Sequence, residues 1–238
     1  MDQKKPSLII LLPSKNEEGG LGEVIDRIPN DEILKLGYVP EVVVVDGNST
    51  DSTCEIAIRK GAVLIHQTGI MGKGGGFKQA MESILLKENI EKDLLIMLDA
   101  DATYHPEDIP RFIEKLASYE VVWGSRLRGE IQHGAMSKIN RLGNVLLSLA
   151  ASILNFKRTT DLCTGYWGFR VPVLESMTLV AKGFSLEAEL FGAVCKGNHS
   201  TKEIAINYDH REGQSNLKWY IDGPKIFYMI IRKRISRT

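Results

Sequence analysis

Residues 94–101 read LLIMLDAD, a continuous apolar run that ends directly in two aspartates. Such a run is typical of a strand that is buried on both faces of a parallel sheet. Similar apolar runs lie at residues 8–12, 42–45 and 62–65, and a shorter one lies at 121–123. Between them, apolar residues recur every three or four positions, as expected for helices that cover a sheet. The alternation of strands and helices predicts an α/β fold with a mostly parallel central sheet flanked by helices.

The second half of the chain is less regular. Its apolar pattern predicts helices at residues 138–156, 185–196 and 222–235 and a strand at 203–207. The first of these helices carries an apolar stripe made of Ile139, Leu142, Leu146, Leu149, Ile153 and Phe156. Further apolar residues beside the stripe make its apolar surface wider than that of a half-buried helix. We expect this helix to belong to the core, and contact with lipid is the alternative.

A single domain is expected for residues 1–238. A chain of 238 residues can bury a full core, and it contains no internal repeat and no long linker. Lys and Arg together number 30, and so do Asp and Glu. This balance argues against a nucleic-acid-binding protein, whose affinity needs a basic excess.

Cysteines and apolar segments bear on the location of the protein. Three cysteines without metal-ligand spacing indicate a reducing compartment, and the five histidines show no spacing typical of a zinc site. The first residues lead into an apolar run that is too short for a signal peptide. The longest near-apolar stretch, residues 145–154, is about half the length of a spanning helix. We therefore expect a cytoplasmic protein that does not span a membrane unaided.

The last segment of the chain is basic. From Asp222 onward, one acidic residue is followed by five basic residues around the apolar run 226–231. The basic residues are Lys225, Arg232, Lys233, Arg234 and Arg237. A basic and apolar segment can bind an anionic membrane surface, and a solvated last helix is the alternative.

Polar side chains follow four of the predicted strands at the point where each strand ends. Glu17 lies shortly after the first strand and Asp46 ends the second. Asp99 and Asp101 follow the fourth strand, and Arg126 follows the fifth. Ligands of open α/β sheets bind beyond the carboxyl ends of the strands, so we expect these groups to share one edge of the sheet.

Asp99 and Asp101 are the central chemical signal. Two carboxylates at this spacing can bind a hard cation through oxygen, whereas a solvated turn is the alternative for an isolated pair. A nucleoside diphosphate leaving group needs such a cation, because negative charge builds on the phosphate as the bond breaks. Residues 13–17, PSKNE, lack the glycine-rich turn of dinucleotide-binding folds, so a nicotinamide cofactor is not expected.

Residues 72–76, GKGGG, resemble a phosphate-binding loop but do not match the Walker pattern. Gln67 stands where that pattern has its first glycine, and Gly74 follows the lysine. The segment suits a flexible loop in which Lys73 reaches an anion, and a glycine-rich start of a helix is the alternative.

Together these motifs resemble glycosyltransferase family 2, and more narrowly its dolichyl-phosphate or polyprenyl-phosphate sugar transferases. The matching segments are residues 12–18, 45–53, 72–74, 98–101, 124–126, 161–170 and 211–217. The resemblance covers about residues 6–225. It implies the Rossmann-like, nucleotide-sugar-binding A-type fold, with residues 6–130 binding the nucleotide sugar and 131–220 the acceptor. Residues 221–238 would then form a basic amphipathic helix.

The resemblance also implies roles for residues on the donor side. Pro13, Glu17 and Asp46 would hold the nucleoside. Asp99 and Asp101 would bind Mg²⁺ or Mn²⁺ together with the diphosphate, which makes Asp101 a catalytic residue. Many family members have a third metal ligand where this chain has Thr103, a weaker donor.

Five basic residues are implied as partners of phosphate groups: Lys73, Arg126, Arg141, Arg211 and Lys218. Arg126 and Arg211 would act in catalysis by neutralising phosphate charge. In many relatives a lysine directly follows the serine that corresponds to Ser215, whereas here Asn216 does, and Lys218 comes two places later.

The function implied is a metal-dependent, inverting transfer of a hexose or N-acetylhexosamine from a UDP- or GDP-sugar to dolichyl or polyprenyl phosphate. A phosphate acceptor is already ionised at neutral pH and needs no general base. We expect the protein to act on the cytoplasmic face of a membrane, by peripheral contact or through a membrane-spanning partner. The alternatives are a soluble transferase to phosphoglycerate or a glycan hydroxyl, and a non-catalytic nucleotide-sugar-binding subunit.

Overall fold

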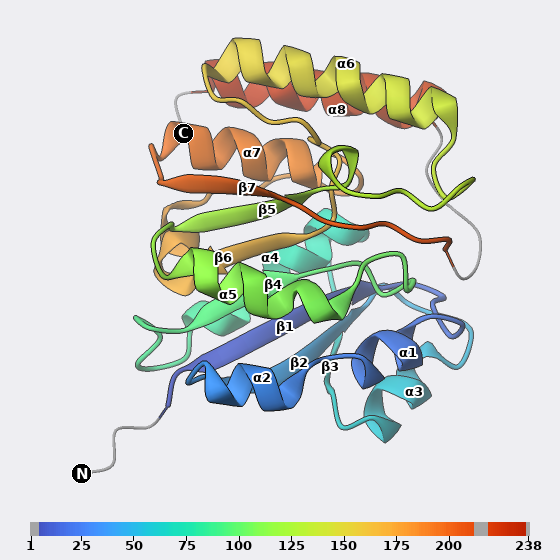
Figure 1. Ribbon diagram of the computed structural model, residues 1–238, viewed down its shortest axis with the longest axis vertical. Helices are drawn as coiled ribbons and strands as arrows, with labels where there is room; N and C mark the ends of the chain where they lie inside the picture. Colours follow the sequence, from blue (N-terminus) through green and yellow to red (C-terminus); the bar gives the residue numbers. More distant parts are fainter. Residues whose placement is uncertain (1–4, 212–218, 237–238) are drawn as a thin grey trace.

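A seven-stranded sheet with the order β3-β2-β1-β4-β6-β5-β7 forms the centre of the protein (Figure 1). The structure is a computed structural model that describes residues 5–211 and 219–236. β6 runs antiparallel to both of its neighbours, and the other pairs are parallel. The strands are β1 (Ser7–Ser14), β2 (Val39–Asp46), β3 (Val63–His66), β4 (Leu94–Met97), β5 (Val121–Ser125), β6 (Trp167–Arg170) and β7 (Thr201–Ala205). The predicted α/β fold with a mostly parallel sheet is confirmed.

Helices cover both faces of the sheet. They are α1 (Leu21–Asp26), α2 (Asn30–Lys35), α3 (Thr53–Arg59), α4 (Lys73–Leu85), α5 (Ile109–Leu116), α6 (Lys138–Asn155), α7 (Leu186–Lys196) and α8 (Trp219–Ile235). Short 3-10 turns lie at Pro106–Asp108, Arg126–Arg128 and Val171–Ser176. Alternate residues of β1 face two cores, because successive side chains of a strand point to opposite faces. Ile9 and Leu11 pack with α4, α7 and α8, whereas Leu8, Ile10 and Leu12 pack with α1, α2, α3 and α5.

Two strands differ from the sequence prediction. The strand expected at residues 203–207 corresponds to β7, which begins and ends two residues earlier than predicted. No strand was predicted at the position of β6. β6 reads WGFR, and its Gly168 packs against Phe112 and Leu116 of α5. A short strand with a glycine in its middle lacks both a long apolar run and a clear alternation, which are the patterns that identify strands.

The expected core position of the helix at 138–156 is wrong for its apolar stripe. Ile139, Leu142, Leu146, Leu149, Ile153 and Phe156 are between 56% and 86% exposed. The buried face of α6 instead carries Asn144, Ser148 and Ala151. The polar pair is satisfied there, because Asn144 donates to Asp161 and the Ser148 hydroxyl accepts from the backbone N–H of Leu162.

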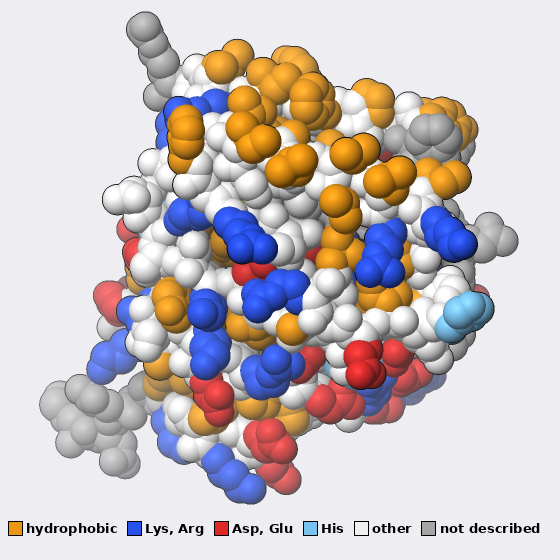
Figure 2. Space-filling model, turned by 45° about the horizontal axis from the view of Figure 1, so that its top comes forward, with side chains coloured by type: hydrophobic (Ala, Val, Ile, Leu, Met, Phe, Trp, Pro, Cys, Tyr) orange, Lys and Arg blue, Asp and Glu red, His pale blue; other side chains and the backbone are white. Residues whose placement is uncertain are grey.

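α6 and α8 lie side by side at one end of the molecule, above α7 (Figure 1). Figure 2 shows hydrophobic side chains gathered over this end, with Lys and Arg beside them. None of the described helices is both long enough and apolar enough to cross a membrane.

A buried ion pair joins the end of β5 to the segment before β6. The Nε and Nη2 atoms of Arg126 donate to the two carboxylate oxygens of Asp161 at 2.8 and 2.7 Å. Asp161 is fully buried, and Asn144 of α6 donates to it at 2.6 Å. One carboxylate thus holds together the strand, the helix and the loop that leads into β6.

Asp161→Ala should destabilise the protein by about 3–5 kcal/mol, because it leaves the Arg126 guanidinium buried without its counter-ion. Urea denaturation of the wild type and the variant measures this loss. As a control, Glu23→Ala removes one of the two carboxylate partners of Arg27 in an exposed pair and should cost less than about 1 kcal/mol, because Glu107 remains paired with Arg27. Equal effects of the two substitutions would contradict this account of Asp161.

Candidate active site

The ends of β1, β2 and β4 and the start of β6 meet at one edge of the sheet. Ser14 is the register partner of Asp46, and the N–H of Gly47 donates to the carbonyl of Ser14 at 2.8 Å. β6 is antiparallel to β4, so the residues before β6 reach the edge at which β4 ends. A Cβ atom at Gly165 would lie 2.5 Å from Oδ2 of Asp99. Only glycine leaves room for that carboxylate.

Three of the six described non-glycine residues with left-handed backbone conformations lie at this edge. Asn16 follows β1 with φ 56°, Asn48 follows β2 with φ 63°, and Ala102 follows Asp101 with φ 61°. Asparagine adopts this conformation more readily than other residues with a Cβ atom, but alanine does not. Such strain is found preferentially at functional sites, where the surrounding structure holds it in place.

Asp101 is buried and fixed in orientation. Its Oδ1 accepts hydrogen bonds from the backbone N–H of Thr103 at 3.1 Å and from the Thr103 hydroxyl at 2.6 Å. Its Oδ2 is buried and forms an ion pair with Arg211. Thr103 therefore orients Asp101.

Asp99 forms an ion-pair triad with Lys73 and Glu187. Nζ of Lys73 lies 2.6 Å from Oδ1 of Asp99 and 2.6 Å from Oε1 of Glu187. Burial disfavours the charged form of Lys73, but the attraction of the two carboxylates is stronger and raises its pKa. Burial also opposes ionisation of Asp99, but Lys73 keeps the pKa of Asp99 below its usual value.

Glu187 was not identified from the sequence. It lies in the first turn of α7, and burial raises its pKa. α7 is an otherwise apolar and buried helix that carries two buried acids, Glu187 and Glu189. Carboxylates in such a helix need partners, and this is the signal that could have revealed Glu187.

Residues 72–76 form the start of α4, which was the alternative to a flexible loop. Gly72 has φ 95° and precedes the helix. Cβ atoms at Gly74 and Gly75 would lie 2.3 and 1.8 Å from the carbonyl oxygens of Ala181 and Ile70. The glycines thus allow the first turn of α4 to pack closely against two other segments of the chain. Lys73 binds the carboxylates of Asp99 and Glu187.

Glu17 is held next to the aspartates. Its backbone N–H donates to the Thr53 hydroxyl at 2.9 Å. Burial raises the pKa of Glu17 to about 7, opposed by the charge of Arg211 and assisted by the charges of Asp101 and Asp99. Glu17 therefore changes its charge near neutral pH.

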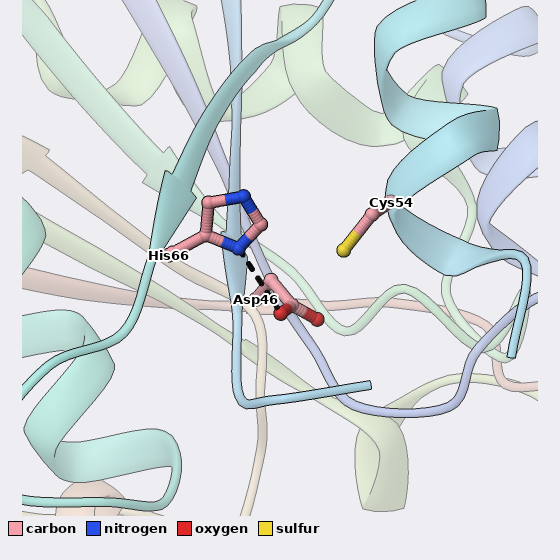
Figure 3. A group of neighbouring side chains, drawn as sticks. All are labelled: Asp46, Cys54 and His66. Carbon is pink, nitrogen blue, oxygen red and sulfur yellow. Dashed lines mark ion pairs between the residues drawn. The ribbon is translucent and has the colours of Figure 1, made fainter. Parts of the chain in front are cut away.

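Asp46 lies at the end of β2 and is 2% exposed. Its carboxylate accepts hydrogen bonds from the backbone N–H groups of Asn48 and Ser49 at 3.2 and 3.1 Å. Burial alone would raise the pKa of Asp46, but the hydrogen bonds outweigh it and hold the pKa below its usual value. The side chains of Cys54 and His66 lie beside it (Figure 3).

The other predicted site residues lie in different surroundings. Arg126 is buried and forms an ion pair with Asp161, which offsets much of the positive charge of Arg126. The guanidinium carbon of Arg126 also lies 5.1 Å from the ring centre of Tyr208. Pro13 is half-buried in β1 and Arg141 is exposed in α6. Lys218 lies outside the described residues.

Comparison with known proteins identifies the family. The model for glycosyl transferase family 2 matches residues 9–178. Glycosyltransferase AglJ of Haloferax volcanii is 31% identical over 230 residues, which cover 95% of this chain and 72% of that protein. The dolichyl-phosphate hexose transferase of the same organism is 30% identical over 229 residues, which cover 94% of this chain and 92% of that protein.

Among solved structures, the fold is similar to that of glucosyl-3-phosphoglycerate synthase from Mycobacterium tuberculosis in complex with Mn²⁺, uridine-diphosphate-glucose and phosphoglyceric acid. The TM-score is 0.72 at 20% identity, and the match covers 96% of this chain and 80% of the other. An identity this low shows the fold alone, which is that of the A-type glycosyltransferases. The family that the sequence motifs indicated is confirmed: the chain belongs to glycosyl transferase family 2 and is a glycosyltransferase.

Proposed function

We propose that this glycosyltransferase transfers a hexose or N-acetylhexosamine from a UDP- or GDP-sugar to dolichyl or another polyprenyl phosphate, with inversion at the anomeric carbon and with Mg²⁺ or Mn²⁺. The observation that carries the proposal is the pair Asp99 and Asp101 at the end of β4, each carboxylate already paired with a cation of the protein. The name of the dolichyl-phosphate hexose transferase supports the acceptor. The ligands of the synthase from Mycobacterium tuberculosis support the donor class and the metal.

The donor atoms at this edge suit a divalent cation. Carboxylate oxygens are the preferred ligands of Mg²⁺ and Mn²⁺, and Asp99 and Asp101 supply them. Four carboxyl groups meet two cations here: Glu17, Asp99, Asp101 and Glu187 with Lys73 and Arg211. With all four carboxyl groups ionised, the group would carry two negative charges in excess, which a divalent cation would offset. When bound, that cation would stabilise the negative charge of the departing nucleoside diphosphate.

The remaining chemistry belongs to residues of the chain. An oxygen of the acceptor phosphate attacks the anomeric carbon, and the bond from that carbon to the diphosphate breaks, with its electron pair leaving on the diphosphate. Acceptor and leaving group are both anions and repel each other. Lys73 and Arg211 would pass from the aspartates to the phosphate groups as the donor and its metal bind, and would offset that repulsion.

Asp101→Asn should lower the transfer rate by on the order of 10³-fold while leaving the fold intact, since it removes charge but keeps the acceptor oxygen for Thr103. Transfer of labelled sugar to polyprenyl phosphate measures the rate, and circular dichroism measures the fold. Asp26→Asn on α1, which loses only an exposed partner of Lys60, is the matched control and should remain active. An active Asp101→Asn enzyme, or full wild-type activity in EDTA, would remove the metal from the scheme.

Mn²⁺ binding should weaken as the pH falls below about 7, because protonation of Glu17 removes a negative charge next to the aspartates. The expected loss is up to about tenfold per pH unit. Calorimetric titration of the protein with Mn²⁺ between pH 6 and 8 measures the affinity. Glu17→Gln should bind Mn²⁺ more weakly at pH 8 and show a flatter dependence on pH. An unchanged slope in this variant would assign the titration to another group.

The end of the molecule formed by α6 and α8 is the surface through which we propose that the protein meets its lipid acceptor. α8, which packs against α6, adds further exposed apolar side chains, namely Tyr220, Phe227, Tyr228, Ile231 and Ile235. Exposed basic residues lie on the same helices, namely Lys138, Arg141, Lys225, Arg232 and Arg234. Apolar area combined with positive charge suits an anionic bilayer. Lys233 is not part of this surface: it is 7% exposed and pairs with Glu189 at 3.0 Å.

A cavity of about 640 Å³ lies between α8 and the segment before α7. Val180, Phe184, Tyr228 and Met229 are among its apolar lining residues, and Lys182, Lys225 and Arg232 are its cations. Asp222 also lines it and pairs with Lys225 at 3.4 Å. The same segment packs against the start of α4, where the carbonyl of Ala181 approaches Gly74 next to Lys73. The cavity thus adjoins the candidate site, and its mix of apolar and basic lining suits a prenyl chain that carries a phosphate.

Leu146→Glu combined with Leu149→Glu should lower binding to anionic vesicles by at least about tenfold, because two exposed leucines of α6 would no longer enter the lipid. Flotation of the protein with vesicles measures binding. Ile58→Glu on α3, where the side chain is 65% exposed, is the matched control and should float as the wild type does. Equal flotation of all three proteins would leave the α6 surface without a role in membrane contact.

A further inference from the structure

Three side chains of different chemistry meet beside the end of β2. Asp46 ends β2, Cys54 lies in the first turn of α3, and His66 ends β3 as the register partner of Asp46. One carboxylate oxygen, the thiol sulfur and one imidazole nitrogen all lie within 4.8 Å of one another. Figure 3 shows the thiol and the imidazole pointing toward the carboxylate from two sides.

We propose that Asp46, Cys54 and His66 form a second cation site, for Zn²⁺ or a similarly thiophilic divalent ion, separate from the site at Asp99 and Asp101. The two sites differ in chemistry. Asp99 and Asp101 offer oxygen alone, which suits Mg²⁺ and Mn²⁺. Sulfur, nitrogen and oxygen together suit zinc, with Cys as the thiolate and His in its neutral form.

The geometry is close to that of a zinc site. Ligand atoms that lie 2.0–2.3 Å from a tetrahedral zinc ion are separated from one another by about 3.5 Å. Nδ1 of His66 already lies 3.5 Å from Oδ2 of Asp46. All three atoms lie within 4.8 Å of one another, so closing the set around an ion requires shifts of no more than about 1 Å.

The side chains differ in how far they can move. Asp46 is fixed by burial and by the N–H groups of Asn48 and Ser49. The side chain of His66 is 66% exposed, and Cys54 is partly exposed, so both can turn toward an ion without disturbing the core. Three protein ligands leave the fourth position to water. The Cys54 thiol gives its proton to the solvent as its sulfur binds the ion.

The consequence for activity rests on the proposed function and on the role that the family resemblance implies for Asp46, which is to hold the nucleoside. An ion bound to the Asp46 carboxylate would occupy the oxygen to which the nucleoside donates a hydrogen bond. It would also offset the negative charge of that carboxylate. Zn²⁺ should therefore inhibit transfer by competing with the nucleotide sugar, even when Mg²⁺ saturates the site at Asp99 and Asp101.

Co²⁺ is the probe for the site itself, because thiolate ligation to Co²⁺ gives a near-ultraviolet charge-transfer band that oxygen ligands do not give. The wild type should show this band with one Co²⁺ per chain, in the absence of any substrate. Cys54→Ser should abolish it, and His66→Gln should weaken Co²⁺ binding by at least about tenfold. Cys195→Ser, which alters a thiol outside the cluster, and Asp101→Asn should both retain the band. A missing band, or a band that survives Cys54→Ser, would overturn the site.

The transfer assay tests the competition separately. Without Zn²⁺, Cys54→Ser and wild type should have equal activity. With Zn²⁺ and saturating Mg²⁺, the wild type should be inhibited and the apparent KM for the nucleotide sugar should rise, while Cys54→Ser resists. Equal inhibition of both would overturn the competition. Absence of transfer without Zn²⁺ would instead count against the proposed function, and the cobalt band would still decide the metal site.

Discussion

The crowding of carboxylates where β4 ends is the constraint on which the candidate site depends. Buried carboxylates repel one another and are stable only with counter-ions. Here Lys73 and Arg211 provide them, from the start of α4 and from the segment after β7. The backbone around the two aspartates is adapted to their positions. Gly165 makes room for the carboxylate of Asp99, and Ala102 takes a left-handed conformation beside Asp101. Segments distant in the sequence are thus held at one edge by a shared need to balance charge.

The strands that end in acidic residues could be predicted from the sequence, because each strand and its acidic residues form one local pattern. Residues 94–101 combine a buried strand with its terminal aspartates, and residues 42–46 do the same for Asp46. What could not be predicted is which distant residues contact one another. Glu187 and Arg211 reach Lys73 and Asp101 across the fold, and the cluster of Cys54 and His66 with Asp46 comes from three elements. No spacing within the chain reports such contacts.

α6 shows why apolar periodicity alone does not identify the buried face of a helix. Its leucine and isoleucine stripe is exposed, while Asn144 and Ser148 are buried because Asp161 and the backbone before β6 bond them. The periodicity shows that polar and apolar residues lie on different sides of the helix, but it does not show which side meets water. A helix can bury its polar face when the polar groups of that face are hydrogen-bonded. Its apolar face is then exposed and available to contact a membrane or another protein.

The placement of β6 ties together parts of the chain that the sequence divides. β6 belongs to the later part, yet its backbone hydrogen bonds lie between β4 and β5 of the earlier part. Without β6, two interior strands would present unpaired N–H and C=O groups along a new edge. Neither part can therefore be excised or exchanged as a self-contained module, because the sheet stays whole only when both are present.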